Sequence, residues 1–255
     1  MSDIKLGLQL IVYGARPNTD LPAVLAEVKE VGYDGAEIGA MHPTLGADFV
    51  LKAFADSGLA LTGIHCGYGD FTDPVKVADN IGFLQAAGSR YLICSGVADN
   101  NSLAGYEASA EVFNQVGQAC KDAGLVFCYH NHAWEFKPLE GGVKGIHRLL
   151  ELTCPDLVKL CTDVYWVTMG RECPREFILR YADRAGYYHF KDGDVQGENG
   201  WIFRELGEGV VDIPNALATV REVGCNWLVC EQDSSQKEPK VSIRESYQYL
   251  RKIGA

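Results

Sequence analysis

The sequence lacks the features that would direct a chain into a membrane or toward a disulfide framework. No apolar run approaches the roughly 20 residues that a membrane helix requires, and no charged-then-apolar leader precedes the first strand-like segment. The nine cysteines are scattered and form no Cys-x-x-Cys pair. We therefore expect reduced core thiols in a cytoplasmic protein that does not bind a membrane.

Basic residues are also scarce. Lys and Arg together number 23 against 34 Asp and Glu, which gives a net charge of −11. An acidic surface repels phosphate backbones, so nucleic acid is not an expected partner. The 255 residues are enough for one large domain or two small ones, and a hydrophobic content of 47% can fill a complete core.

A glycine-rich phosphate loop, typical of doubly wound sheets after their first strand, is missing as well. The first apolar run is followed by Tyr13-Gly14-Ala15-Arg16-Pro17 instead. What recurs is a helix ending, in which a glycine capable of a left-handed turn comes just before a short apolar run. These glycines are Gly32, Gly58, Gly88, Gly124 and Gly224. Strands that alternate with helices in this way indicate βαβ units and a parallel sheet.

Eight such units fit into the sequence. We expect Asp20 to cap the first helix, which ends at Val31, and the last helix to cover residues 241–252. Eight units without a spare strand predict an α/β fold, a single closed (β/α)8 barrel, in one domain over residues 1–255. The expected strands lie in residues 5–12, 35–39, 61–66, 91–95, 125–136, 157–163, 187–191 and 227–231.

The stretch 125–136 carries the densest chemistry. Its apolar run ends in His130, Asn131 and His132, and Glu135 follows closely. Side chains alternate faces along a strand, so His130 and His132 project the same way. Three groups able to bind a metal or transfer a proton, all at one strand end, exceed what a buried core needs.

Other predicted strands end in ionisable residues, and the strand ends of a (β/α)8 barrel converge on one site. Carboxylates mixed with imidazoles suit Mn2+, Mg2+, Co2+ or Zn2+ rather than a thiolate-seeking metal. The sequence therefore predicts a metal site at this end of the barrel. The residues at these ends are His65, Asp163, His189, Lys191 and Glu231.

Several polar residues allow a second interpretation. Asp163 or Asp192 could cap the helix that follows it rather than serve the site. Glu37, at the end of the second strand, could belong to the site or anchor the barrel rim. His42 and His147 fall in loop or helix segments, and we expect both on the surface.

Five segments carry a family resemblance. They are Tyr129–Phe136, Thr162–Trp166, His189–Asp192, Gly207–Asp212 and Cys230–Asp233. Together they resemble the xylose isomerase-like TIM barrels, the sugar phosphate isomerase/epimerase superfamily. This superfamily also holds ketose 3-epimerases, inosose dehydratases and endonuclease IV. The similarity extends over essentially the whole chain.

The resemblance implies one divalent cation, Mn2+ ahead of Mg2+, Co2+ and Zn2+, held by Glu, Asp, His and Glu from separate strands. Asp163, His189 and Glu231 match the last three ligands. We assign the first to Glu135, with His130 as the alternative because it stands where many relatives have Glu. The implied catalytic residues are His130, Glu135 and Glu231, and the implied substrate-binding residues are His65, His132, Trp166 and Lys191.

The resemblance further implies proton removal next to a carbonyl, through an enediolate that the cation stabilises. We expect a sugar isomerase or epimerase; a dehydratase or lyase of keto-sugars or keto-inositols is the alternative. An endonuclease IV-like phosphodiesterase and a non-catalytic sugar-binding barrel are more remote. The expected partner is a small sugar or keto-sugar, without phosphate because no phosphate nest is evident. Family members are often dimers or tetramers, so the resemblance also allows a homo-oligomer.

Overall fold

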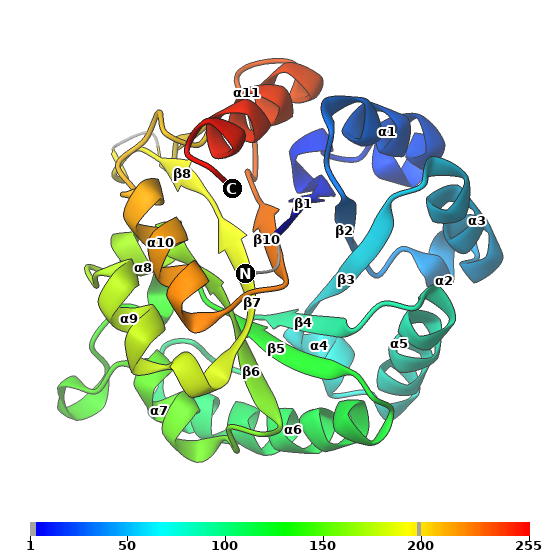
Figure 1. Ribbon diagram of the computed structural model, residues 1–255. Coiled ribbons are helices and arrows are strands. Elements are labelled where there is room, and N and C mark those ends of the chain that lie inside the picture. Colours follow the sequence, from blue (N-terminus) through cyan, green and yellow to red (C-terminus); the bar gives the residue numbers. More distant parts are fainter. Residues whose placement is uncertain (1–3, 198–199) are drawn as a thin grey trace.

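A closed barrel of parallel strands forms the centre of the molecule (Figure 1). The computed structural model describes residues 4–197 and 200–255. The segment in which no leader is expected includes residues 1–3, which lie outside the described part. The eight strands close in the order β1-β10-β7-β6-β5-β4-β3-β2, which confirms the predicted (β/α)8 barrel. Their bounds are β1 Lys5–Gln9, β2 Gly35–Gly39, β3 Ala60–Gly67, β4 Tyr91–Ser95, β5 Val126–His130, β6 Val158–Asp163, β7 Ala185–Phe190 and β10 Trp227–Cys230.

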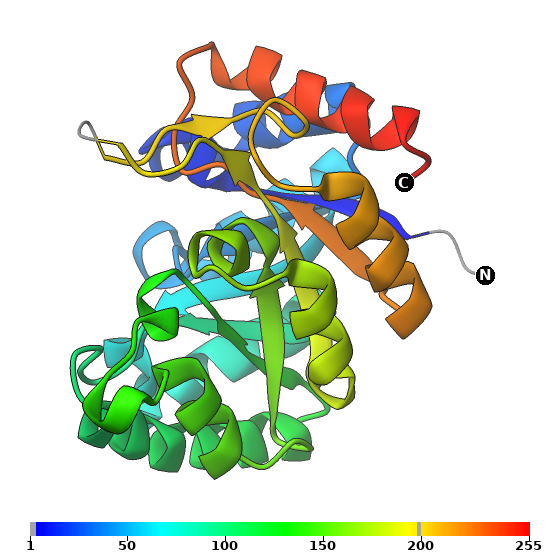
Figure 2. The ribbon, with the colours of Figure 1, turned by 90° about the vertical axis from the view of Figure 1, so that its left-hand side faces the viewer.

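Helices surround the barrel on its outer face (Figures 1 and 2). The longer ones are α1 Pro17–Val31, α3 Ala47–Ser57, α5 Pro74–Ala87, α6 Leu103–Asp122, α7 Gly145–Leu152, α10 Ile213–Val223 and α11 Pro239–Lys252. Shorter helices lie in the connections: α2 His42–Leu45, α4 Tyr68–Phe71, α8 Val164–Met169, α9 Pro174–Arg180 and the 3-10 turns η1 Leu10–Tyr13, η2 Trp134–Phe136, η3 Glu140–Gly142 and η4 Ala182–Arg184. The start of β1 and the end of the chain after α11 lie on the same side of the barrel (Figure 2).

Two predicted elements end or begin elsewhere than expected. The first strand stops at Gln9, because the Gln9 side chain accepts the N–H of Ile11 and starts the turn η1. Helix α1 begins three residues before Asp20, but it bends at Asp20, whose dihedral angles are not helical. The backbone N–H of Ala23 points to Oδ1 of Asp20, with 3.4 Å between N and Oδ1. Asp20 therefore caps the longer second part of the helix.

The helix-ending glycines behave as predicted. Gly58 and Gly88 end α3 and α5 with φ of 66° and 65°, a left-handed conformation that costs glycine little. In each case the next strand begins within three residues, at Ala60 and Tyr91. These short connections join each helix directly to the next strand, as the sequence predicted.

The expectation of no spare strand is wrong. Strand β8, Asp192–Gly193, pairs antiparallel with β9, Phe203–Arg204, outside the barrel. The buried carboxylate of Asp192 accepts backbone N–H groups from Gly193, Gly207, Gly209 and Val211, at 2.9–3.1 Å. Three of these bonds fix the segment after the hairpin, so Asp192 holds the loop of residues 207–212 in place rather than capping a helix.

The core has two parts. Inside the barrel lies a small cluster that includes Ile93, Cys128, Cys161 and Val229, and the larger cluster fills the space between strands and helices. All nine cysteines are free, and only Cys154 and Cys173 are exposed, as expected for core thiols. Within the described residues, no helix is both long enough and apolar enough to cross a membrane.

The surface assignment of His42 is wrong. Only 3% of the residue is exposed, since its ring stacks on Phe83 at 4.2 Å and its Nε2 lies 2.9 Å from Asp79. The apolar neighbour comes from α5, which the local sequence of α2 does not reveal. His147 is half-buried, between the Tyr181 hydroxyl and Glu172.

Candidate metal centre

Four ionisable side chains meet at the C-terminal ends of four adjacent strands. His130 ends β5, Asp163 ends β6, His189 belongs to β7, and Glu231 follows β10. The strands are parallel, so their ends lie at one rim; Asp163 and His189 are direct neighbours in the strand register. Each residue offers a ligand atom, and these atoms all lie within 4.8 Å of one another.

The four side chains are buried and incompletely paired. No properly oriented hydrogen bond satisfies His130 Nε2, Asp163 Oδ2, His189 Nδ1 or Glu231 Oε2. His130 Nε2 lies 3.5 Å from Asp163 Oδ2 and 3.7 Å from Glu231 Oε2, and His189 Nδ1 contacts the same Glu231 oxygen. Unpaired buried polar atoms are costly, and a shared cation would satisfy one atom of each residue. The donor set therefore fits a divalent metal that accepts both oxygen and nitrogen.

Glu135 lies outside this group. Its carboxylate accepts the Tyr129 hydroxyl at 2.8 Å and the backbone N–H of His132 at 2.9 Å. Both contacts are local, and they tie the turn η2 to the end of β5. Of the two residues considered for the strand-five ligand, the geometry brings His130, not Glu135, to Asp163, His189 and Glu231.

Glu37, on β2, connects two histidines of the site. Its Oε2 lies 2.8 Å from Nε2 of His189, and its Oε1 lies 3.0 Å from Nδ1 of His65. A carboxylate accepts, so each histidine donates an N–H to Glu37 and directs its other ring nitrogen away from Glu37. Burial alone would raise the pKa of Glu37, but the two histidines hold it below the usual value. Glu37 thus orients His189 so that its Nδ1 faces the cluster, as carboxylates behind metal-binding histidines do.

Asp163 has both of the roles considered for it. Its Oδ1 accepts the N–H of Trp166 at 2.9 Å and caps α8, whereas its Oδ2 faces the cluster. Burial raises the pKa of this carboxyl to about 7, although Lys191 opposes the effect. A bound cation would favour the ionised form.

Lys191 lies beside the cluster. Its Nζ is 3.2 Å from Glu231 Oε1, contacts Asp233, and lies over the ring of Trp166 at 4.8 Å. Burial would raise the pKa of Glu231, but Lys191 and the neighbouring histidines hold it well below its usual value. Lys191 and Trp166 thus form the layer next to the carboxylates.

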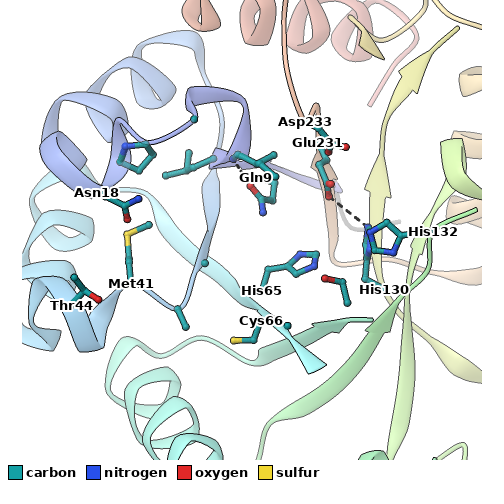
Figure 3. A pocket seen from close by; sticks show the side chains of 18 residues that line it. Gln9, Asn18, Met41, Thr44, His65, Cys66, His130, His132, Glu231 and Asp233 are labelled. Carbon is teal, nitrogen blue, oxygen red and sulfur yellow. Dashed lines mark hydrogen bonds and ion pairs between the residues drawn. The ribbon is translucent and has the colours of Figure 1, made fainter. Parts of the chain in front are cut away.

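A cavity of about 490 Å³ opens at this rim (Figure 3). His65, His130, His132 and Glu231 line it, with Asp233 beside them. His132 also stacks on Trp134 at 3.8 Å. Of the predicted substrate-binding residues, His65 and His132 therefore reach the cavity, whereas Trp166 and Lys191 are not among its lining residues.

Comparison with known proteins identifies the family. The family described as "Xylose isomerase-like TIM barrel" matches residues 25–253. The chain belongs to this family.

Among the similar proteins in this xylose isomerase-like family are inosose dehydratases. The inosose dehydratase of Lacticaseibacillus casei is 24% identical over 97% of this chain and 96% of that protein. That of Geobacillus kaustophilus is 27% identical, over 58% of this chain and 53% of that protein.

Solved structures share the fold of this xylose isomerase-like barrel. A sugar phosphate isomerase/epimerase from Parabacteroides distasonis superposes with a TM-score of 0.84 at 21% identity, covering 100% of this chain and 97% of its own. The IolI protein with a bound zinc atom superposes with a TM-score of 0.76 at 12% identity, covering 98% of each chain. At these identities the likeness shows the fold alone.

Sequence reasoning missed two residues of this xylose isomerase-like site. Asn131 is buried; its Oδ1 accepts the N–H of Asp163 at 3.0 Å, and its Nδ2 donates to the Asp163 carbonyl at 3.3 Å. Asn131 thus holds β5 and β6 together directly behind the cluster. The sequence feature that could have indicated this role is its position between His130 and His132, which places its side chain on the other face of the strand. Asp233 follows Glu231 by two residues, and that spacing on one face could have indicated it.

Proposed function

We propose that this chain is a divalent-metal-dependent enzyme that removes a proton next to the carbonyl of a small, unphosphorylated keto-sugar or keto-cyclitol. Loss of the substituent on the next carbon would then make it a dehydratase or lyase. The observation that carries the proposal is the set of four buried, unpaired ligand atoms at the end of an open cavity. The full-length likeness to an inosose dehydratase supports the dehydratase outcome.

His130, Asp163, His189 and Glu231 would hold the cation. When bound, a divalent cation polarises a carbonyl and stabilises the negative charge that develops on its oxygen. Two imidazoles beside two carboxylates favour Mn2+, Co2+ or Zn2+ over Mg2+, which prefers oxygen ligands. The zinc atom in the IolI structure supports a metal in this fold.

His65 and His132 would handle protons. Glu37 accepts the Nδ1–H of His65, so the other ring nitrogen of His65, Nε2, would be the one to accept a proton at the cavity wall. His132 lines the same cavity from the end of β5, and its ring lies 4.8 Å from that of His130. One group to accept a proton and a second to donate one are what an elimination needs.

Epimerisation or isomerisation is the second candidate. It uses the same first step, and the proton then returns to carbon. The specific observation in its favour is that His65 and His132 reach the cavity from different strands, β3 and the end of β5, so a proton could return from another direction. A phosphodiesterase is disfavoured, because the residues lining the cavity in the described part include no Lys or Arg.

The deciding experiment is a product screen in deuterated water. The Mn2+-loaded and Zn2+-loaded protein is incubated with inososes, 3-keto-glucose and free ketoses, and products are followed by NMR. A dehydratase gives an unsaturated or deoxy product, whereas an epimerase gives an isomer with deuterium at the exchanged carbon. The Glu231→Gln variant should lose both the exchange and the product. Exchange that persists without any metal would overturn the proposal.

A further inference from the structure

We infer that the substrate is a conjugate: a keto-sugar or keto-cyclitol ring that carries a neutral, partly apolar substituent. The substituent would bind in the part of the cavity remote from the metal cluster, which we call the distal arm. This inference rests on the proposed function only for the ring. The distal arm is formed by Leu10, Ile11, Pro17, Asn18, Met41 and Thr44.

The cavity is a single space with two ends (Figure 3). His130, His132 and Glu231 lie at one end, and Met41 and Thr44 lie at the other, with His65 and Gln9 between them. A volume of about 490 Å³ falls within the roughly 300–1,000 Å³ of pockets that hold drug-sized ligands. A ring bound at the metal end would leave the distal arm uncovered, since the residues of the arm lie in η1, in α1, and in or just before α2, and not on the strands that carry the cluster.

The surface of the distal arm is suited to a neutral group. Four of its six side chains are apolar: Leu10 and Pro17 are buried and form its wall, whereas Ile11, 43% exposed, and the partly exposed Met41 offer apolar surface. Covering such surface is favourable, and the amide of Asn18 and the hydroxyl of Thr44 add hydrogen-bonding capacity. None of the six is charged, so an anionic substituent would gain no partner there. An aromatic group or the apolar face of a second sugar has this chemistry.

Binding and exchange measurements test the arm. Isothermal titration calorimetry of the Mn2+-loaded protein measures affinity without turnover. The ligands are D-glucose and its methyl, phenyl and glucosyl β-D-glucopyranosides. The 3-keto forms of the same four compounds report hydrogen exchange in deuterated water. We expect the phenyl or the glucosyl compound to bind about 10- to 100-fold more tightly than the free sugar, the range for burying one large side-chain-sized apolar group. Which of the two binds better distinguishes an aromatic substituent from a glycosyl one.

The variant Met41→Trp fills the distal arm. It should reduce the preference for the substituted compound to near unity, and Val75→Trp, a larger increase in side-chain size at a 76% exposed position on α5, should leave the preference intact. Equal affinity for free and substituted compounds, or a preference that survives Met41→Trp, would overturn the inference. If no keto compound exchanges but the preference and its loss in Met41→Trp are observed, the arm stands and the proposed reaction fails.

Discussion

The Glu37 carboxylate lies 2.8 Å from Nε2 of His189, although the two residues are 152 positions apart. Strands β2 and β7 are not neighbours; β1 and β10 separate them in the barrel. The contact therefore crosses the barrel interior, and it fixes which nitrogen of His189 faces the cluster. A carboxylate behind a metal-binding histidine both orients the ring and increases its basicity.

Replacing Glu37 should weaken metal binding without removing a ligand. Because the Glu37→Gln amide cannot accept from both histidines as a carboxylate does, we expect metal affinity to fall by about 10- to 100-fold. Competition with a chelating dye measures this. Glu30→Gln, at an exposed site on α1, is the matched control. Unchanged affinity in Glu37→Gln would show that His189 needs no such support.

The strand-five ligand can be identified by metal content. In His130→Ala the cluster loses one of its four donors, so we expect metal to be lost or bound at least about 10-fold more weakly. Glu135→Gln should keep the metal, because that carboxylate contacts Tyr129 and the His132 backbone. Elemental analysis, and the rise in melting temperature on adding Zn2+ or Mn2+, report the result. The reverse pattern would assign the ligand to Glu135.

Glu205 should make the stability of the protein depend on pH in acid. Its carboxylate is buried, which alone would raise its pKa, but Lys237 at 2.9 Å and Ser242 lower the pKa to about 2. An unfolded Glu titrates near pH 4.3, so between about pH 4.5 and 2 the unfolded state binds more protons. The free energy of unfolding therefore falls as the pH falls through this window.

The variant Glu205→Gln tests this assignment. Urea unfolding at several pH values between 5 and 3 should show that wild type loses its advantage over Glu205→Gln as the pH decreases. Glu208, 3.5 Å from the same Lys237 but about half exposed, supplies the control Glu208→Gln. A constant difference between wild type and Glu205→Gln across this range would refute the role of Glu205.

Asp192 should be important for stability rather than for metal binding. In Asp192→Asn, one acceptor oxygen becomes an NH2 group that faces backbone N–H donors, so two of the four loop bonds are lost. We expect destabilisation by about 2–6 kcal/mol, given about 1–3 kcal/mol for each of the two donors left unpaired. Thermal unfolding measures it. Asp212→Asn, which changes an exposed cap on α10, should cost less.

The sequence predicted the barrel and three of the four clustered residues, and the reason is local. Hydrophobic strands that end in His or Asp, and glycines that end helices, are visible within about ten residues. The choice between His130 and Glu135 was not visible, because it depends on the turn η2 and on the hydroxyl of Tyr129. Glu37 was left open for a similar reason: its partners are on β3 and β7, and only barrel closure brings them together.

The position of the described chain ends has a practical consequence. Ile4 precedes β1 and Ala255 follows α11, and the two ends of the ribbon lie on one side of the barrel, at the rim where the strands begin (Figure 2). The cavity opens at the opposite rim, where residues at the strand ends line it. A tether to a solid support through either end should leave the cavity mouth facing the solution. Substrates too large to diffuse past a nearby matrix could then still be screened on the immobilised protein.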